Sequence, residues 1–105
     1  MGIKKGNAPK TFPAELELVG GGESSKLRLT YHNRKPSELA DWLKELEGSD
    51  APFLPSMVLH IVKSMETDYS LSLEGVLEME DERPGICDAI IAGFHQTRRV
   101  TLQGN

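Results

Sequence analysis

The fold is decided by the stretch AELELVGGGESSKLRLTY, residues 14–31. In both halves, apolar side chains alternate with polar ones: Leu16 and Leu18 in the first, Leu27, Leu29 and Tyr31 in the second. A period of two is typical of a strand with one buried face, and the segment GGGESS between the runs is typical of a hairpin loop. We therefore expect an antiparallel β-hairpin over about residues 14–32. A hairpin alone is only marginally stable in water, so its leucines should pack on the rest of the chain.

After the hairpin, apolar residues recur with helical spacing. The spacing predicts four helices, at about residues 36–47, 55–66, 72–79 and 84–97. Their apolar stripes are Leu39, Trp42, Leu43 and Leu46; Leu54, Met57, Val58, Ile61, Val62 and Met65; Leu73, Val76 and Leu77; and Ile86, Ala89, Ile90 and Phe94. Pro36 and Pro84 suit a first helical turn, where the missing N–H costs nothing. On the second helix, His60, Lys63 and Ser64 take the solvent-facing side.

Strands followed by helices indicate an α+β fold. The 105 residues are enough for one domain. We expect a flexible N-terminal arm over residues 1–11 and a single, mainly helical globular domain over 12–105. Gly75 inside the third helix costs about 1 kcal/mol relative to alanine, which weakens that helix.

Composition restricts the class of protein. The net charge of −4 argues against a nucleic-acid binder, because such proteins need a basic face for phosphates. No apolar run approaches the length that spans a bilayer, and the residues after Met1 do not form a secretory signal, so we expect no membrane association. A single cysteine cannot form an internal disulfide, which fits the cytoplasm.

The residue types that carry chemistry do not combine into a site. Cys87 stands near the start of a helix, but His95 lies about 12 Å farther along that helix and cannot serve it as a base. The three histidines, His32, His60 and His95, lack the i, i+3 or i, i+4 spacing of metal ligands. The glycines at 20–22 lie between two strands and not before a helix, where phosphate-binding loops lie.

The acidic run Glu78–Glu82 precedes Pro84, and Arg98 and Arg99 close the same predicted helix. Negative charge before a helix and positive charge at its end are both favoured by the helix dipole. We therefore interpret these charges, and Cys87, as structural. The sequence predicts no catalytic, cofactor-binding or metal-binding residue, and no cofactor.

From Met57 on, the chain resembles the tail assembly chaperone family of long-tailed bacteriophages. The resembling residues are MVLHIVKSMETDYSLSLEGVLEMEDERPGICDAIIAGFHQTRRVTLQGN. The family pattern is an apolar helix, a short Leu-rich helix, an acidic turn into Pro-Gly, an Ile-Ile-x-x-aromatic helix and an Arg before Gly-Asn. The matching residues are Ile61, Val62, Leu73, Leu77, Pro84, Gly85, Ile90, Ile91, Phe94, Gly104 and Asn105. Met65 departs from the pattern, which has a tryptophan there.

The resemblance implies a non-enzymatic assembly factor. Such chaperones bind the long, helical tape measure protein and help recruit tail tube subunits, and in many phages a frameshift adds a C-terminal extension. An apolar helix face covering a stripe of the partner would serve this role. The alternatives are a small cytoplasmic protein-binding or regulatory module unrelated to phage and a small hydrolase, against which the absence of a catalytic constellation counts. The sequence does not identify the partner-binding residues, and it leaves self-association open.

Overall fold

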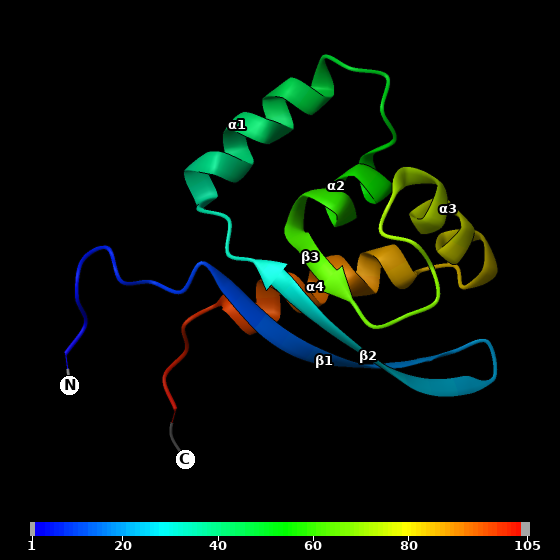
Figure 1. Ribbon diagram of the computed structural model, residues 1–105, viewed down its shortest axis with the longest axis horizontal. Coiled ribbons are helices and arrows are strands. Elements are labelled where there is room, and N and C mark those ends of the chain that lie inside the picture. The colour runs from blue at the N-terminus through cyan, green and yellow to red at the C-terminus, as the bar shows by residue number, and fades with distance from the viewer. Residues whose placement is uncertain (1, 104–105) are drawn as a thin grey trace.

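The structure, a computed structural model, describes residues 2–103 of the chain. It contains three strands and four helices: β1 Thr11–Gly20, β2 Glu23–His32, α1 Pro36–Glu47, α2 Phe53–Ile61, β3 Val62–Met65, α3 Leu73–Glu82 and α4 Ile86–Arg98. The strands form one antiparallel sheet in the order β1-β2-β3 (Figure 1). The predicted α+β class is confirmed. Gly104 and Asn105, the last residues of the family pattern, lie outside the described residues.

The hairpin is longer and its turn tighter than the sequence indicated. Gly20 pairs with Glu23, so only Gly21 and Gly22 form the turn. Both have positive φ angles, +60° and +85°, as a type I′ hairpin turn requires. The rest of the GGGESS segment belongs to the strands, and β1 already begins at Thr11.

The predicted second helix, 55–66, is wrong in its second half. The helix α2 ends at Ile61, and Val62–Met65 form β3, which pairs with the far side of β2. Thr30 pairs with Ser64, and the Glu66 N–H donates to the Arg28 carbonyl at 2.8 Å. These bonds satisfy backbone groups of β2 that a continued helix would leave unpaired, so sheet pairing overrides the helical spacing of the apolar residues.

The other helices lie close to their predicted positions. The bounds of α1 match the prediction of 36–47, and α4 begins two residues later and ends one later than expected. The helix α3 extends to Glu82, three residues beyond the expected end, so the acidic run is helical. Gly85 has a φ of +99° and joins α3 to α4.

The core lies between the sheet, α2, α3 and α4. Leu27, Leu29 and Tyr31 of β2 are buried in it, and Leu16 and Leu18 of β1 are half-buried against it. The expectation that the hairpin packs on the helices is therefore confirmed.

One close contact fixes α4 against the sheet. The Tyr31 hydroxyl donates to the Ile90 carbonyl at 2.7 Å, and the rings of Tyr31 and Phe94 meet edge to face at 5.5 Å. Gly93 permits this approach, because a Cβ there would lie 2.5 Å from Leu16 Cδ2 and 2.9 Å from the Tyr31 oxygen.

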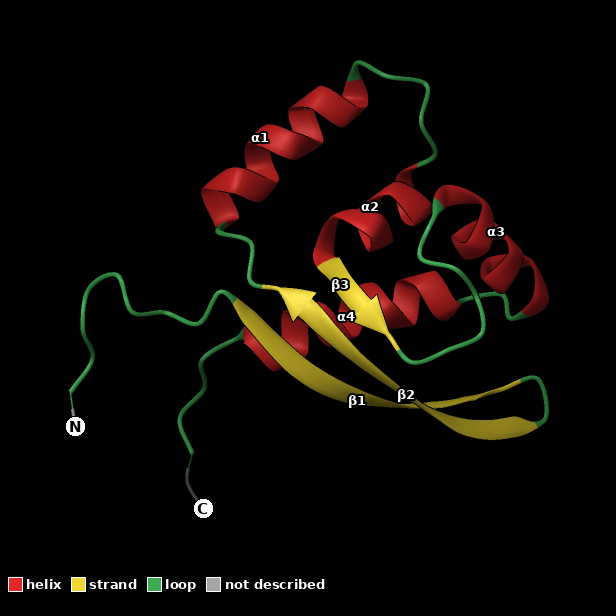
Figure 2. Ribbon diagram, viewed as in Figure 1, coloured by secondary structure: helices red, strands yellow, loops and turns green. Residues whose placement is uncertain are grey.

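The helix α1 extends away from this core (Figure 2). Of its apolar stripe, Leu39 is buried and Trp42 is half-buried against the core. Leu43 and Leu46 are also half-buried, but they do not belong to the core cluster. The predicted stripe is present, but only its first half is packed into the core.

The N-terminal residues 2–10 form neither helix nor strand, and their side chains are exposed. The Asn33 N–H donates to the Lys10 carbonyl at 2.9 Å and the Asn33 side chain donates to the Pro9 carbonyl at 2.8 Å, so this segment is tied to β2 at its end. Its flexibility stays a prediction. Within residues 2–103, none of the helices combines the length and apolar character needed to cross a bilayer.

Candidate functional site

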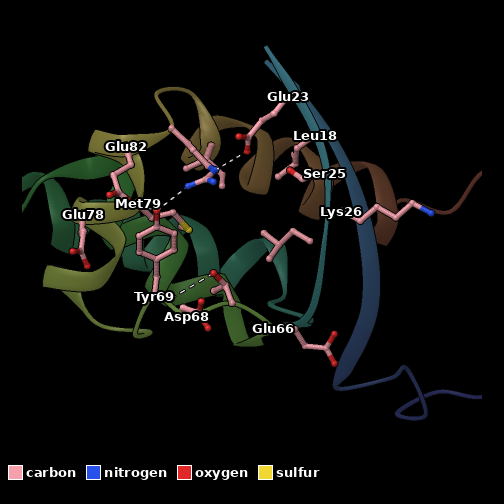
Figure 3. Close-up of a pocket in the computed structure, with 14 residues that line it drawn as sticks. Leu18, Glu23, Ser25, Lys26, Glu66, Asp68, Tyr69, Glu78, Met79 and Glu82 are labelled. Carbon is pink, nitrogen blue, oxygen red and sulfur yellow. Dashed lines mark hydrogen bonds and ion pairs between the residues drawn. The ribbon is translucent and has the colours of Figure 1, made fainter. Parts of the chain in front are cut away.

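A cleft of about 540 Å³ lies between the distal half of the hairpin and α3 (Figure 3). Most of its walls come from three segments: Leu18, Ser25 and Leu27 of the hairpin, Asp68 and Tyr69 of the loop after β3, and Glu78, Met79 and Glu82 of α3; Ile86 of α4 also lines it. We call it the hairpin–α3 cleft. Because Glu78 and Glu82 of α3 line it, this cleft is the candidate site for chemistry by the acidic run.

Arg83 ties the walls of this cleft together. Its Nε donates to Glu23 at 3.1 Å and its Nη1 donates to the Tyr69 hydroxyl at 2.9 Å. The Tyr69 hydroxyl in turn donates to Glu82, and that hydrogen bond raises the pKa of Tyr69. The side chains of Arg83 and Glu23 are about half-exposed, so their ion pair contributes little to stability. A tyrosine with a raised pKa stays protonated at neutral pH, so Tyr69 is not a base here.

Within the acidic run, Glu80 forms hydrogen bonds to the next helix, a role that the sequence did not assign to this residue in particular. The Glu80 carboxylate accepts the Gly85 N–H at 2.9 Å and the Cys87 N–H at 3.0 Å, so it caps the first turn of α4. The bond from Gly85, and then that from Cys87, lower the pKa of Glu80. The expectation that an acid of this run supports the next helix is confirmed for Glu80. Because α3 turns back on α4, the cap comes from one helix to the next, which sequence spacing alone does not show.

Cys87 is fully buried in the core. Burial, followed by the hydrogen bond and charge of Glu80, raises the pKa of its thiol to about 12. The nucleophilic form of cysteine is the thiolate, which is scarcely populated at neutral pH when the pKa is this high. The prediction that Cys87 belongs to the core is confirmed.

The histidines do not come together as ligands. His95 lies beside the Phe94 ring on the exposed side of α4. Burial, and then the charge of Arg34, lower the pKa values of both His32 and His60. In residues 2–103, no three His, Cys, Asp or Glu side chains are arranged to hold a metal ion.

His60 has a role that the sequence missed. Its ring stacks on Trp42 of α1 with centroids 4.2 Å apart and planes at 7°, and its carbonyl accepts Arg34 Nε at 3.0 Å. The expectation that His60 faces solvent is wrong, because the Trp42 ring covers it. Its Nε2 is buried, without a hydrogen-bond partner among the described residues. Helical periodicity placed each residue on its own helix, but it does not show which helices meet.

The apolar stripe of α3 is rotated from its expected direction. Val76 is buried, together with Gly75 and Met79, whereas Leu73 and Leu77 are each 44% exposed. Gly75 lies on the buried side of α3 and permits a close approach of the preceding loop, because a Cβ there would lie 2.1 Å from the Ser70 carbonyl oxygen. Leu71, just before the helix, is 37% exposed. We call Leu71, Leu73 and Leu77 the α3 leucine stripe.

No family model, curated protein or solved structure matches this chain. The resemblance to tail assembly chaperones stays a prediction.

Proposed function

We propose that this protein is a non-enzymatic tail assembly chaperone of a phage or prophage. It binds the tape measure protein in the bacterial cytoplasm and helps recruit tail tube subunits. The resemblance from Met57 onward motivates the proposal, and the α3 leucine stripe is the observation that carries it on structural grounds. Leu73 and Leu77 are presented by α3, Leu71 lies just before its N-cap, and all three are partly exposed.

The spacing of the stripe suits a helical partner. Leu73 and Leu77 are one helical turn apart and lie on one face, so an amphipathic partner helix can run along both. Covering a leucine that is about half-exposed contributes on the order of 1 kcal/mol. Three leucines therefore supply part of the affinity, which suits a partner that is bound during assembly and released afterwards.

The side chains that could take part in catalysis are held by the fold, which supports a binding role. The Cys87 thiol is buried and protonated, and the Glu80 carboxylate is held by two backbone N–H groups. Tyr69 and Arg83 hold the walls of the hairpin–α3 cleft together. Each of these groups is therefore buried or engaged in hydrogen bonds within the fold.

The test is co-expression with the adjacent gene for a very long, helix-rich protein, followed by co-purification at low and high salt. The parent chain should keep the long protein soluble and co-purify with it. The contact is mainly apolar, so high salt should weaken it little. The double variant Leu73→Asp/Leu77→Asp should lose the long protein while keeping its own melting temperature.

The matched control is Val100→Asp/Leu102→Asp, which makes the same chemical change at residues 95% and 97% exposed outside the helices. This control should co-purify as the parent does. If the long protein is equally soluble without this chain and never co-purifies with it, the chaperone proposal fails. A binding module unrelated to phage would then be the better account.

A further inference from the structure

The strand β1 forms a long free edge of the sheet. In the β1–β2 register, Thr11 lies opposite His32 and Gly20 opposite Glu23, so Lys10 lies opposite Asn33. The Asn33 N–H donates to the Lys10 carbonyl, so this pair is a hydrogen-bonded pair of the ladder. Hydrogen-bonded pairs alternate along an antiparallel ladder, so the even positions of β1 direct their backbone groups to β2. The odd positions therefore direct their N–H and C=O groups away from the sheet.

Pro13 occurs at one of these outward positions, where its missing N–H breaks no bond of the ladder. A proline protects an edge by removing a donor, but it does so only locally. Beyond it, Glu15, Glu17 and Val19 retain outward N–H groups. The segment Glu15–Val19 is therefore the part of the edge that is open to another strand. The opposite edge, β3, has only four residues.

A groove of about 970 Å³ lies beside this open segment, between the tip of the hairpin and the start of α4. Glu17 and Val19 line it at the edge, and Leu18, Ile86 and Ala89 are among its apolar residues. Successive side chains of an added strand point to opposite faces of the sheet. Every second side chain of such a strand would point toward this groove. Glu23, Glu82 and Arg83 also line it, so an apolar side chain there would pack on Leu18, Ile86 and Ala89.

The opposite face of β1 is acidic along the same segment. Glu15 already has cations, with Arg28 Nε at 2.8 Å and Lys26 Nζ at 3.8 Å. Within residues 2–103, no cation lies within 4.0 Å of Glu17. On the β2 side, the register partner of Glu17 is Lys26, whose Nζ lies within 4.0 Å of Glu15 and not of Glu17. On the open side of β1, a lysine or arginine of an added strand would lie opposite Glu17 and complement its charge.

We propose that the segment Glu15–Val19 of β1 receives an extended protein segment in which basic and apolar residues alternate, added as a fourth strand to the sheet. Main-chain hydrogen bonds to Glu15, Glu17 and Val19 supply the ladder, the groove takes the apolar side chains and Glu17 faces a basic one. A second copy pairing through the same segment brings Glu15 and Glu17 close to the same two glutamates, and like charges across strands are destabilising. This surface is separate from the α3 leucine stripe and does not depend on the proposed function.

The test uses a fluorescent ten-residue peptide of alternating arginine and valine, titrated with the full chain by fluorescence anisotropy. Two peptides serve as controls: alternating glutamate and valine, and a block of arginines followed by a block of valines. The alternating basic peptide should bind, and each control should bind at least about tenfold more weakly. Equal binding of the block peptide would overturn the proposal, because it would show attraction by charge alone.

Two variants separate the backbone from the charge. Glu17→Pro removes one outward N–H and the charge, and should weaken peptide binding by about tenfold. Glu17→Ala removes only the charge, and a two- to fivefold weakening, roughly the range for an exposed ion pair, is expected. If Glu17→Pro melts below the parent, Glu17→Lys takes its place and should lose the basic peptide.

Amide hydrogen exchange of the parent gives a second readout. The peptide should protect the amides of Glu15, Glu17 and Val19, and Leu73→Asp/Leu77→Asp should bind it as the parent does. Protection confined to other residues would overturn the proposal. So would a concentration-dependent dimer that Glu17→Pro abolishes, because a second copy would then be the occupant.

Discussion

The helices α4 and α1 are similar in length, and both carry an apolar stripe, but their environments differ. In α4, Cys87, Ile90 and Phe94 are fully buried, and Gly93 brings the helix against Leu16 and Tyr31. In α1, Leu39 alone is buried, and Trp42 reaches the core through its stack on His60. A helical stripe thus predicts which face turns inward. How far that face is covered depends on whether the other elements offer a matching surface.

The largest effect is expected from Phe94→Ala in α4. Phe94 packs on Tyr31, and its ring is also stacked with Phe12 at 6.0 Å, so the substitution leaves a cavity in the centre of the core. We expect the free energy of unfolding to fall by about 3–5 kcal/mol, measured by urea denaturation. A loss below about 1 kcal/mol would show that α4 is no better packed than α1.

A smaller effect is expected from Cys87→Ala, at the other end of the α4 stripe. The substitution removes a buried sulfur but keeps the backbone N–H that Glu80 accepts. The free energy of unfolding should fall by roughly 1–2 kcal/mol, and partner binding should be unchanged. Alkylation of the Cys87 thiol in the folded parent protein is the independent check. Rapid reaction of the thiol would contradict the burial of this helix face.

Lowering the pH should weaken the attachment of α1. The pKa of His60 lies below its ordinary 6.5 because of burial and the charge of Arg34, and that of His32 is lowered in the same direction. The unfolded chain therefore binds protons first, so stability is fully present above about pH 6.5 and falls as the pH drops below it. The Glu38 charge opposes this shift at His60.

Urea denaturation at pH 7.5, 6 and 5 measures this effect, with His60→Gln as the comparison. The variant should lose less stability than the parent over that range. Glu80, whose pKa is lowered, contributes its own loss only below about pH 4.5. An equal pH dependence in the two proteins would show that the His60–Trp42 stack does not titrate.

The smallest effect is expected from Leu46→Ser in the last turn of α1. Leu46 lies outside the core cluster, so serine creates no core cavity. The free energy of unfolding should change by less than about 0.5 kcal/mol. A loss comparable with that of Cys87→Ala would mean that α1 is packed along its whole length.

The fold was largely predictable from local patterns. Strand alternation gave the hairpin, and Pro36 with its apolar stripe gave the bounds of α1. The strand β3 was missed because Val62 and Met65 continue the helical spacing of α2, and only the unpaired edge of β2 decides between the two structures. Such information is non-local, and a pattern within one segment does not contain it.

The candidate surfaces were less predictable. The face of α3 that is buried includes Gly75, which the loop at Ser70 approaches closely, and a glycine in a helix signals only a local cost in the sequence. The acidic run did suggest helix capping, but the choice of Glu80 depends on how α3 folds back on α4. The open edge of β1 follows from the turn at Gly21 and Gly22, which fixes which backbone groups face outward.

Amide hydrogen exchange, measured residue by residue in the free protein, is the most direct test of a tightly packed sheet–α4 core with a loosely attached α1. The amides of Ile90–Phe94 and Leu27–Tyr31 should exchange only through global unfolding. Those of Leu43–Glu47 should exchange through local opening, on the order of a hundredfold faster or more. If the amides of α1 exchange as slowly as those of α4, the two helices belong to one cooperative unit, and the claim that α1 is loosely attached is wrong.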